Sequence, residues 1–340
     1  MSKTTYIIGA GFSRYAKLPL MNDFYFMSKD IYTRLDNDEI RKSFQIVFKY
    51  FDEFSKVKNI MEADFYNIEE LLSIIEMDSF LLRKKNSKDY LLFLQKVIEY
   101  SSPQKIDEEG YYIIDNDNNS EIYTSFLMNV YGINKTNLKS GDNYFQRINN
   151  DNGIISLNYD LMLEKALYRL NIFNKQLYGK NDCFDFNYGL DDSYINHIYT
   201  NTPRFPKLKL AKIHGSINFI DNKSPLIIPP TWNKISNKKM IKVWNLAYNI
   251  LSQSEEIIFI GYSLPETDLY VKYLLISGVK KCYNLKKVTV ICPDEDFMIR
   301  KRYEHFFDEN FRNKAFDFVP KTFENWFGIP KRSSTIRYLK

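Results

Sequence analysis

The sequence predicts an α/β fold, with a mostly parallel sheet and a helical insertion beside it. Short apolar runs alternate with segments of helical spacing, and each run ends in glycine, asparagine, histidine or aspartate. This alternation is typical of parallel sheets, whose neighbouring strands are joined by helices. The 340 residues are 44% hydrophobic and 26% charged, enough for a sizeable core. No repeat or linker divides the chain, so we expect one domain over residues 1–340.

The first strand is expected at Thr4–Ile8, followed by the turn Gly9-Ala10-Gly11. Helical spacing then runs from Phe12 to about Leu35, with a break at Leu18-Pro19. Two further segments have one apolar helix face each, the first at Phe65, Ile68, Leu71, Leu72 and Ile75, the second at Leu91, Leu94, Val97 and Ile98. A polar loop or hairpin tip follows at 101–121. We therefore predict a helical insertion at about 25–145.

The second half of the chain returns to strands and helices in alternation. The run GIIS predicts a buried strand from Gly153, and a helix follows with the stripe Leu163, Ala166, Leu167 and Leu170. LKLAKIHGS predicts a strand that ends at His214-Gly215. Next come a helix near 238–252, the strands EEIIFI and KKVTVIC, and a helical tail at about 300–340.

Composition and charge narrow the class of protein. The net charge of +5 is spread along the chain among 42 acidic residues, without the basic patch that makes direct nucleic-acid binding probable. Cys183, Cys282 and Cys292 have no C-x-x-C spacing, so we expect neither a disulfide framework nor a metal site. No secretory leader and no apolar run of about 20 residues is visible. We expect a cytoplasmic protein without membrane contact.

The strand-end segment GAGFS has the G-x-G spacing of a phosphate-binding loop. Arg14 stands where dehydrogenases carry a third glycine. They also place an acid about 20 residues on, at the end of a second strand, but here that region has helical spacing. The dehydrogenase interpretation is therefore disfavoured. A simple turn after a strand remains the alternative.

Two more strand ends carry reactive side chains. In SLNYD, the Asn158 amide and the Asp160 carboxylate could grip a ribose or a carboxamide, although Asp160 could equally cap the next helix. In KIHGS, His214 is suited to proton transfer near neutral pH, although a single histidine is often structural. His197 and His305 lack this strand-end setting.

The segment GYSLPETD follows a fourth apolar strand. Ser263 and Glu266 have the spacing of a helix capping box, which would explain the segment without a ligand. A helix that starts after a glycine turn can also bind an anion, so a ligand-binding role of this segment remains the alternative.

In their order, GAGFS, NIEELLS, SLNYD, KIHGS, IIPPTW and GYSLPETD resemble the bacterial sirtuin-like NAD hydrolase family of antiphage defence. The resemblance runs from about Thr4 to Phe323–Phe327, nearly the whole chain. It implies a Rossmann-like, mostly parallel sheet with helices on both faces and a helical insertion. It also implies a single sirtuin-like catalytic domain that uses NAD as substrate and needs no metal. The implied effector role is depletion of cellular NAD during abortive infection.

The resemblance also implies residue roles. Asn158 and His214 would be catalytic, with Asn158 orienting the ribose and a water and His214 accepting a proton. The residues that would bind NAD are Gly9, Ala10, Gly11, Phe12, Ser13, Asn158, Tyr159, Asp160, Gly215, Gly261, Tyr262, Ser263 and Asp294.

The sequence departs from sirtuin deacylases at several positions. Lys17 replaces a glycine, Leu20-Met21 replace Asp-Phe, and no cysteine quartet follows His214, which favours hydrolysis over deacylation. The alternatives are a sirtuin-type deacylase or ADP-ribosyltransferase, and a non-catalytic NAD- or ADP-ribose-binding regulatory subunit. Because unregulated hydrolysis would kill the host, we expect gating by a homo-oligomer or by a partner such as a hexameric ATPase or an argonaute-like protein.

Overall fold

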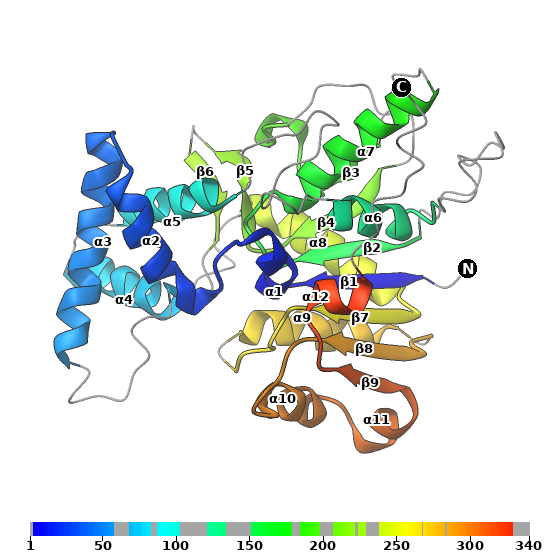
Figure 1. The fold of residues 1–340 in the computed structure, drawn as a ribbon. Coiled ribbons are helices and arrows are strands. Elements are labelled where there is room, and N and C mark those ends of the chain that lie inside the picture. Colours follow the sequence, from blue (N-terminus) through cyan, green and yellow to red (C-terminus); the bar gives the residue numbers. More distant parts are fainter. Residues whose placement is uncertain are drawn as a thin grey trace.

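The computed structural model describes residues 3–57, 68–82, 87–102, 121–133, 151–178, 184–197, 207–221, 224–228, 238–266, 268–282 and 284–328. The strands of its main sheet are β1 (Thr4–Ile8), β2 (Gly153–Ser156), β3 (Phe186–Asn187), β4 (Leu208–Lys212), β7 (Glu256–Ile260), β8 (Lys287–Ile291) and β9 (Phe316–Val319). Their order is β3-β4-β2-β1-β7-β8-β9, and every neighbouring pair is parallel (Figure 1). This confirms the predicted α/β class.

Helices cover both faces of the sheet (Figure 1). One face carries α6 (Glu121–Val130) and α7 (Met162–Tyr178), and the other carries α8 (Lys238–Ser252) and α9 (Leu269–Lys280). Tyr6 of β1 faces α6, where its ring centroid lies 5.3 Å from that of Phe126. Gly153 of β2 faces α8, and a Cβ there would lie 2.7 Å from Ile250. All five residues of β1 are buried because both faces of a central parallel strand are covered.

The helices α2 (Phe24–Thr33), α3 (Asp38–Val57), α4 (Ile68–Leu81) and α5 (Ser87–Ser101) form a group beyond the carboxyl ends of the strands, blue to cyan in Figure 1. Aromatic contacts join them, such as the ring pair Phe44–Phe93 at 4.7 Å. The predicted apolar faces are buried at Ile68, Leu71, Leu72, Ile75, Leu94, Val97 and Ile98, and Leu91 is half-buried. Phe65 lies outside the described residues. The insertion boundaries of about 25 and 145 stay a prediction.

The region after β1 contains only short helical segments before α2. They are α1 (Ala10–Ser13) and two single 3-10 turns at Arg14–Ala16 and Met21–Asp23. Between these turns Lys17 has a left-handed backbone with φ of 63°. The predicted break at Leu18-Pro19 is therefore present, and it begins one residue earlier.

Three features of the second half differ from the prediction. Strand β4 ends at Lys212, and Gly215 instead opens an antiparallel hairpin of β5 (Gly215–Asp221) and β6 (Ser224–Ile227). The two-residue strand β3 was not predicted. The tail is not wholly helical, since β9 stands among the helices α10 (Met298–Phe306), α11 (Glu309–Ala315) and α12 (Phe323–Phe327). Within the described sheet β9 is an edge strand beside β8, and it is half-buried. An edge strand does not need the apolar run of a central strand, which explains why periodicity did not predict it.

Candidate active site

Four strand ends lie side by side at one edge of the sheet, in the order β4, β2, β1, β7. Ile8 pairs with Ser156 and with Ile260, and Ser156 pairs with Lys212, so the four strands end in register. The segments 9–13, 157–160, 213–215 and 261–263 therefore leave neighbouring strands about 4.8 Å apart. The chain reverses its direction across the sheet between β1 and β7. In open α/β sheets, ligands bind in the crevice at such a switch point.

The two glycine turns at the switch point pack directly against each other. Gly11 N donates to Gly261 O at 2.9 Å, and Gly9 N donates to Ile260 O at 3.0 Å. A Cβ on Gly261 would lie 2.4 Å from the carbonyl carbon of Gly11. This close approach explains why the sequence requires glycine there. Because both N–H groups are used within the protein, a phosphate would have to be bound by other groups of the loop.

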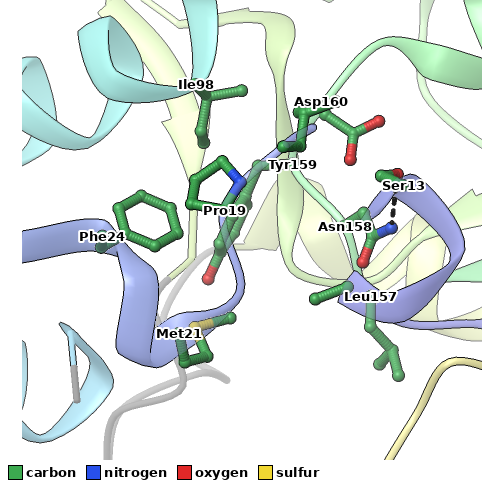
Figure 2. Close-up of a pocket in the computed structure, with 11 residues that line it drawn as sticks. Ser13, Pro19, Met21, Phe24, Ile98, Leu157, Asn158, Tyr159 and Asp160 are labelled. Carbon is green, nitrogen blue, oxygen red and sulfur yellow. Dashed lines mark hydrogen bonds between the residues drawn. The ribbon is translucent and has the colours of Figure 1, made fainter. Parts of the chain in front are cut away.

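Asn158 joins the β2 segment to the glycine turn of β1. Its Nδ2 donates to Gly9 O at 2.9 Å and to Ser13 Oγ at 3.1 Å. The carbonyl of Gly9 fixes the orientation of the amide, because it can accept but not donate. Figure 2 shows the amide nitrogen directed toward Ser13 and the oxygen on the opposite side. Within the described residues Oδ1 accepts no hydrogen bond, so it is the atom that Asn158 offers to a ligand.

Asp160 stands at the start of α7. Its Oδ1 accepts a hydrogen bond from Met162 N at 2.9 Å, so the predicted helix cap is present. The side chain is only half-buried and also lines a pocket, where the capping role leaves Oδ2 for a ligand. Capping and binding are thus compatible for this residue.

The pocket lies between the strand ends and the helical insertion (Figure 2), with an empty volume of about 380 Å³ that includes its opening to solvent. It is lined by Ala10, Ser13, Leu18, Pro19, Met21, Phe24, Ile98, Leu157, Asn158, Tyr159 and Asp160. Apolar walls with a few convergent polar groups are typical of small-molecule sites. The amide oxygen and the carboxylate are suited to a small ligand that carries a carboxamide or a hydroxyl.

Five pocket residues come from outside the strand ends and were not predicted as site residues. Leu18, Pro19 and Met21 belong to the loop after α1, Phe24 begins α2 and Ile98 is part of α5. Their apolar character predicted only core packing. No sequence signal distinguishes Ile98 from the other buried residues of its helix face.

His214 is buried in the turn between β4 and β5 and is not among the residues that line this pocket. Its ring centroid lies 6.2 Å from that of Tyr159, whose side chain does line the pocket. The neighbouring Gly215 has φ of 83°, and a Cβ there would lie 2.0 Å from Leu226 O across the hairpin. The fold thus brings His214 next to the pocket, with Tyr159 beside it.

Tyr262 and Asp294, two of the predicted NAD-binding residues, make hydrogen bonds within the protein and are not among the residues that line this pocket. The Tyr262 hydroxyl lies 2.9 Å from Asp268 Oδ2, and both carboxylate oxygens of Asp294 cap α10 by accepting from Ile299 N and Arg300 N. The predicted capping box of Ser263 and Glu266 is wrong, because α9 begins only at Leu269. Phe12 points into the core and contacts Phe323 at 4.5 Å between ring centroids, so a ligand would meet only its backbone.

In the parts that the structure describes, no group of three or more His, Cys, Asp or Glu side chains could hold a metal ion. No helix among the described residues is long and apolar enough to cross a membrane.

No protein-family model matches the sequence, and no curated protein matches it. Solved structures similar to the chain are sirtuins. One is Sir2Tm bound to a propionylated peptide, at 11% identity over 99% of this chain and 94% of that chain, with a TM-score of 0.39. Another is a complex of Sir2, p53 peptide and NAD+, at 10% identity over 99% and 94%, with a TM-score of 0.38. The fold class given above rests on the order and register of this chain's own strands.

Proposed function

We propose that this protein is an NAD hydrolase that cleaves the nicotinamide–ribose bond and releases nicotinamide and ADP-ribose. The observation that carries the proposal is the convergence of Ser13, Asn158 and Asp160 on one pocket beside the switch point of the sheet. The order of the strand-end motifs, which resembles that of sirtuin-like NAD hydrolases, supports it. The proposal places the protein in the cytoplasm, without a membrane or nucleic-acid partner.

The pocket is suited to the nicotinamide end of the substrate. The Asp160 carboxylate would accept a hydrogen bond from the carboxamide, while Pro19, Phe24 and Ile98 would cover the pyridine ring. The amide oxygen of Asn158 would accept a hydrogen bond from a ribose hydroxyl or from the attacking water. Such contacts hold the leaving group and the anomeric carbon in the geometry of the reaction.

In the proposed reaction, the bond between the anomeric carbon and the pyridinium nitrogen breaks, and its electron pair leaves with neutral nicotinamide. The positive charge that develops on the anomeric carbon is removed when the oxygen of a water molecule bonds to it. The water then gives its proton to His214, acting as general base. Because His214 lies beside Tyr159 and outside the pocket lining, this step requires a shift of the Tyr159 ring or of the β5–β6 hairpin.

The test is to incubate the purified chain with NAD and to measure nicotinamide release. The assay is run with and without the expected partner, taken as the protein encoded by the neighbouring gene. We expect His214→Ala to lower kcat by about 100-fold or more, since general bases contribute about 10²–10⁴-fold. His305→Ala, at an exposed position of α10, is the matched control and should keep full activity. Asn158→Ala should also lose activity, and its melting temperature must be compared because it loses the bonds to Gly9 and Ser13.

A non-catalytic NAD- or ADP-ribose-binding subunit is the second candidate, and the burial of His214 favours it. Such a subunit would bind NAD and release no nicotinamide, even when assembled with its partner. Equal activity of the wild type and His214→Ala would also contradict the proposed mechanism.

We further propose that the enzyme is the gated effector of an antiphage system and that the helical insertion is its assembly surface. In support, large apolar side chains are exposed on the insertion at Phe26, Met77, Phe80, Leu81 and Tyr100. Aromatic residues and methionine are enriched at the cores of protein interfaces. Light scattering alongside the activity assay tests this proposal, since full activity of a monomer without a partner would contradict it.

A further inference from the structure

A buried ion pair lies next to Asp160, one of the residues that line the pocket. Lys212, the last residue of β4, places its Nζ 3.0 Å from Oε1 of Glu164 in the first turn of α7. Their side chains are only 1% and 4% exposed. Removing two charges from water costs more free energy than a buried pair usually returns, and apolar residues in its place are often as stable. A contribution to the stability of the fold is therefore a weak explanation for the presence of this ion pair.

The hydrogen bonds of the pair are unevenly satisfied. The Tyr188 hydroxyl donates to Glu164 Oε1 at 3.3 Å, which gives that oxygen two donors. The other oxygen, Oε2, is buried and has no partner among the described residues. An unsatisfied buried acceptor destabilises a protein. The geometry thus holds the Lys212 ammonium group in place at some cost in stability.

The ammonium group has a second acceptor, which belongs to the pocket. Lys212 Nζ donates to the backbone carbonyl of Asp160 at 2.5 Å. Asp160 is the residue whose carboxylate lines the pocket and whose Oδ1 is held by Met162 N. Lys212 therefore binds the backbone carbonyl of Asp160, while Met162, the first residue of α7, binds its carboxylate.

We infer that Lys212 is a positioning residue, held by Glu164, that sets the Asp160 carboxylate for the carboxamide of the leaving group. The inference rests on the proposed function. Lys212 also lies two residues before His214, so the same ion pair connects the segment of Asn158 and Asp160 to the turn that carries the histidine.

The experiment uses the full chain with Lys212→Met combined with Glu164→Leu. The double substitution removes both charges, so it avoids the strong destabilisation expected when only one partner of a buried pair is lost. Lys207→Met is the matched control, because Lys207 pairs with Asp185 at 2.7 Å near the opposite end of the same strand. Its substitution should leave KM and kcat unchanged.

We expect the double variant to raise KM for NAD by about ten-fold, with kcat within about two-fold of the wild type, because a contact made equally to substrate and transition state changes KM alone. Inhibition by added nicotinamide should weaken by a similar factor. A merely structural role would instead reduce the folded fraction, so that apparent kcat falls and KM stays constant. That result would overturn the inference.

A second measurement distinguishes failure of the Lys212 inference from failure of the proposed NAD hydrolase function. Asp160→Asn should raise KM in the wild type and add little in the double variant, since both changes act through one contact. Full additivity would overturn the inference while the proposed function stands. A wild type that neither cleaves nor binds NAD would overturn both.

Discussion

Lys17 has a left-handed backbone, with φ of 63° and ψ of 20°, which is unusual for a residue other than glycine. This conformation costs an L-residue about 1–2 kcal/mol. The turn is needed because it directs the next residues, Leu18 and Pro19, toward the pocket.

Lys165 gives a prediction for the pH dependence of stability. Burial lowers the pKa of its ammonium group to about 8, although Asp160 and Glu164 partly oppose the shift. Below pH 8 the group is charged in the folded and unfolded states, and the folded state carries the full desolvation cost. Between pH 8 and about 10.4, the unfolded state binds more protons, so the free energy of unfolding rises by up to about 1.4 kcal/mol per pH unit.

Lys165→Met removes this titration. We expect the stability of the variant relative to the wild type to be greater at pH 7 than at pH 10, because only the wild type gains stability over that range. Urea unfolding of both proteins at the two pH values measures the difference. A difference that does not change with pH would contradict the lowered pKa.

The elements that meet at the switch point are held together by their loops. The turns after β1 and β7 share a hydrogen bond between Gly11 and Gly261, and there is no room for a side chain between them. Parallel strands bring these loops together because their carboxyl ends lie at one edge of the sheet. The glycines are therefore explained by the packing of the two loops against each other, and this packing leaves ligand binding possible.

Gly261→Ala should destabilise the protein by about 2–5 kcal/mol, through strain at a φ of 63° and overlap with the backbone of Gly11. Gly328→Ala is the control, since its φ is also positive, at 83°, and a Cβ there would meet nothing within 4 Å. Thermal unfolding compares the two variants. Equal losses would show that backbone strain, and not overlap between the loops, explains Gly261.

At the scale of the molecule, the two ends of the described chain pack together. Helix α12 near the C-terminus places Phe323 against Phe12 of the first loop and against Tyr123 and Phe126 of α6. Tyr123 also holds the loop after β1, since its hydroxyl lies 3.1 Å from Phe12 O and 3.1 Å from Ala16 N. The first loop of the site is thus supported by the last helix.

Phe323→Ala should cost about 3–5 kcal/mol, as expected for a fully buried phenylalanine. Phe80→Ala on α4 is the matched control, because that ring is 79% exposed and its loss should change stability by at most about 0.5 kcal/mol. Urea unfolding midpoints give both values. Similar losses for the two variants would contradict the supporting role of α12.

The central strands, the main helix faces and the positions of Asn158 and Asp160 after a strand could be predicted from the sequence alone. These follow from local periodicity and from the types of residue that end parallel strands. His214 was expected at the end of a strand and lies two residues beyond it. Strand β3 was not predicted because it has only two residues, and β9 because it is only half-buried. The start of α9 was predicted too early. The β5–β6 hairpin was not predicted because it depends on the pairing of its two strands. Gly215 shows this dependence, since its left-handed φ and its close contact with Leu226 arise from the hairpin.

Which of the predicted residues share a pocket became clear from the packing of the elements. This packing brought Ile98 and Phe24 of the insertion to Asn158 and Asp160, and it placed His214 beside Tyr159 instead of in the pocket wall. It also joined Lys212 to the Asp160 carbonyl. Periodicity records which face of an element is apolar, whereas contacts between distant segments depend on how whole elements pack, which no local pattern contains.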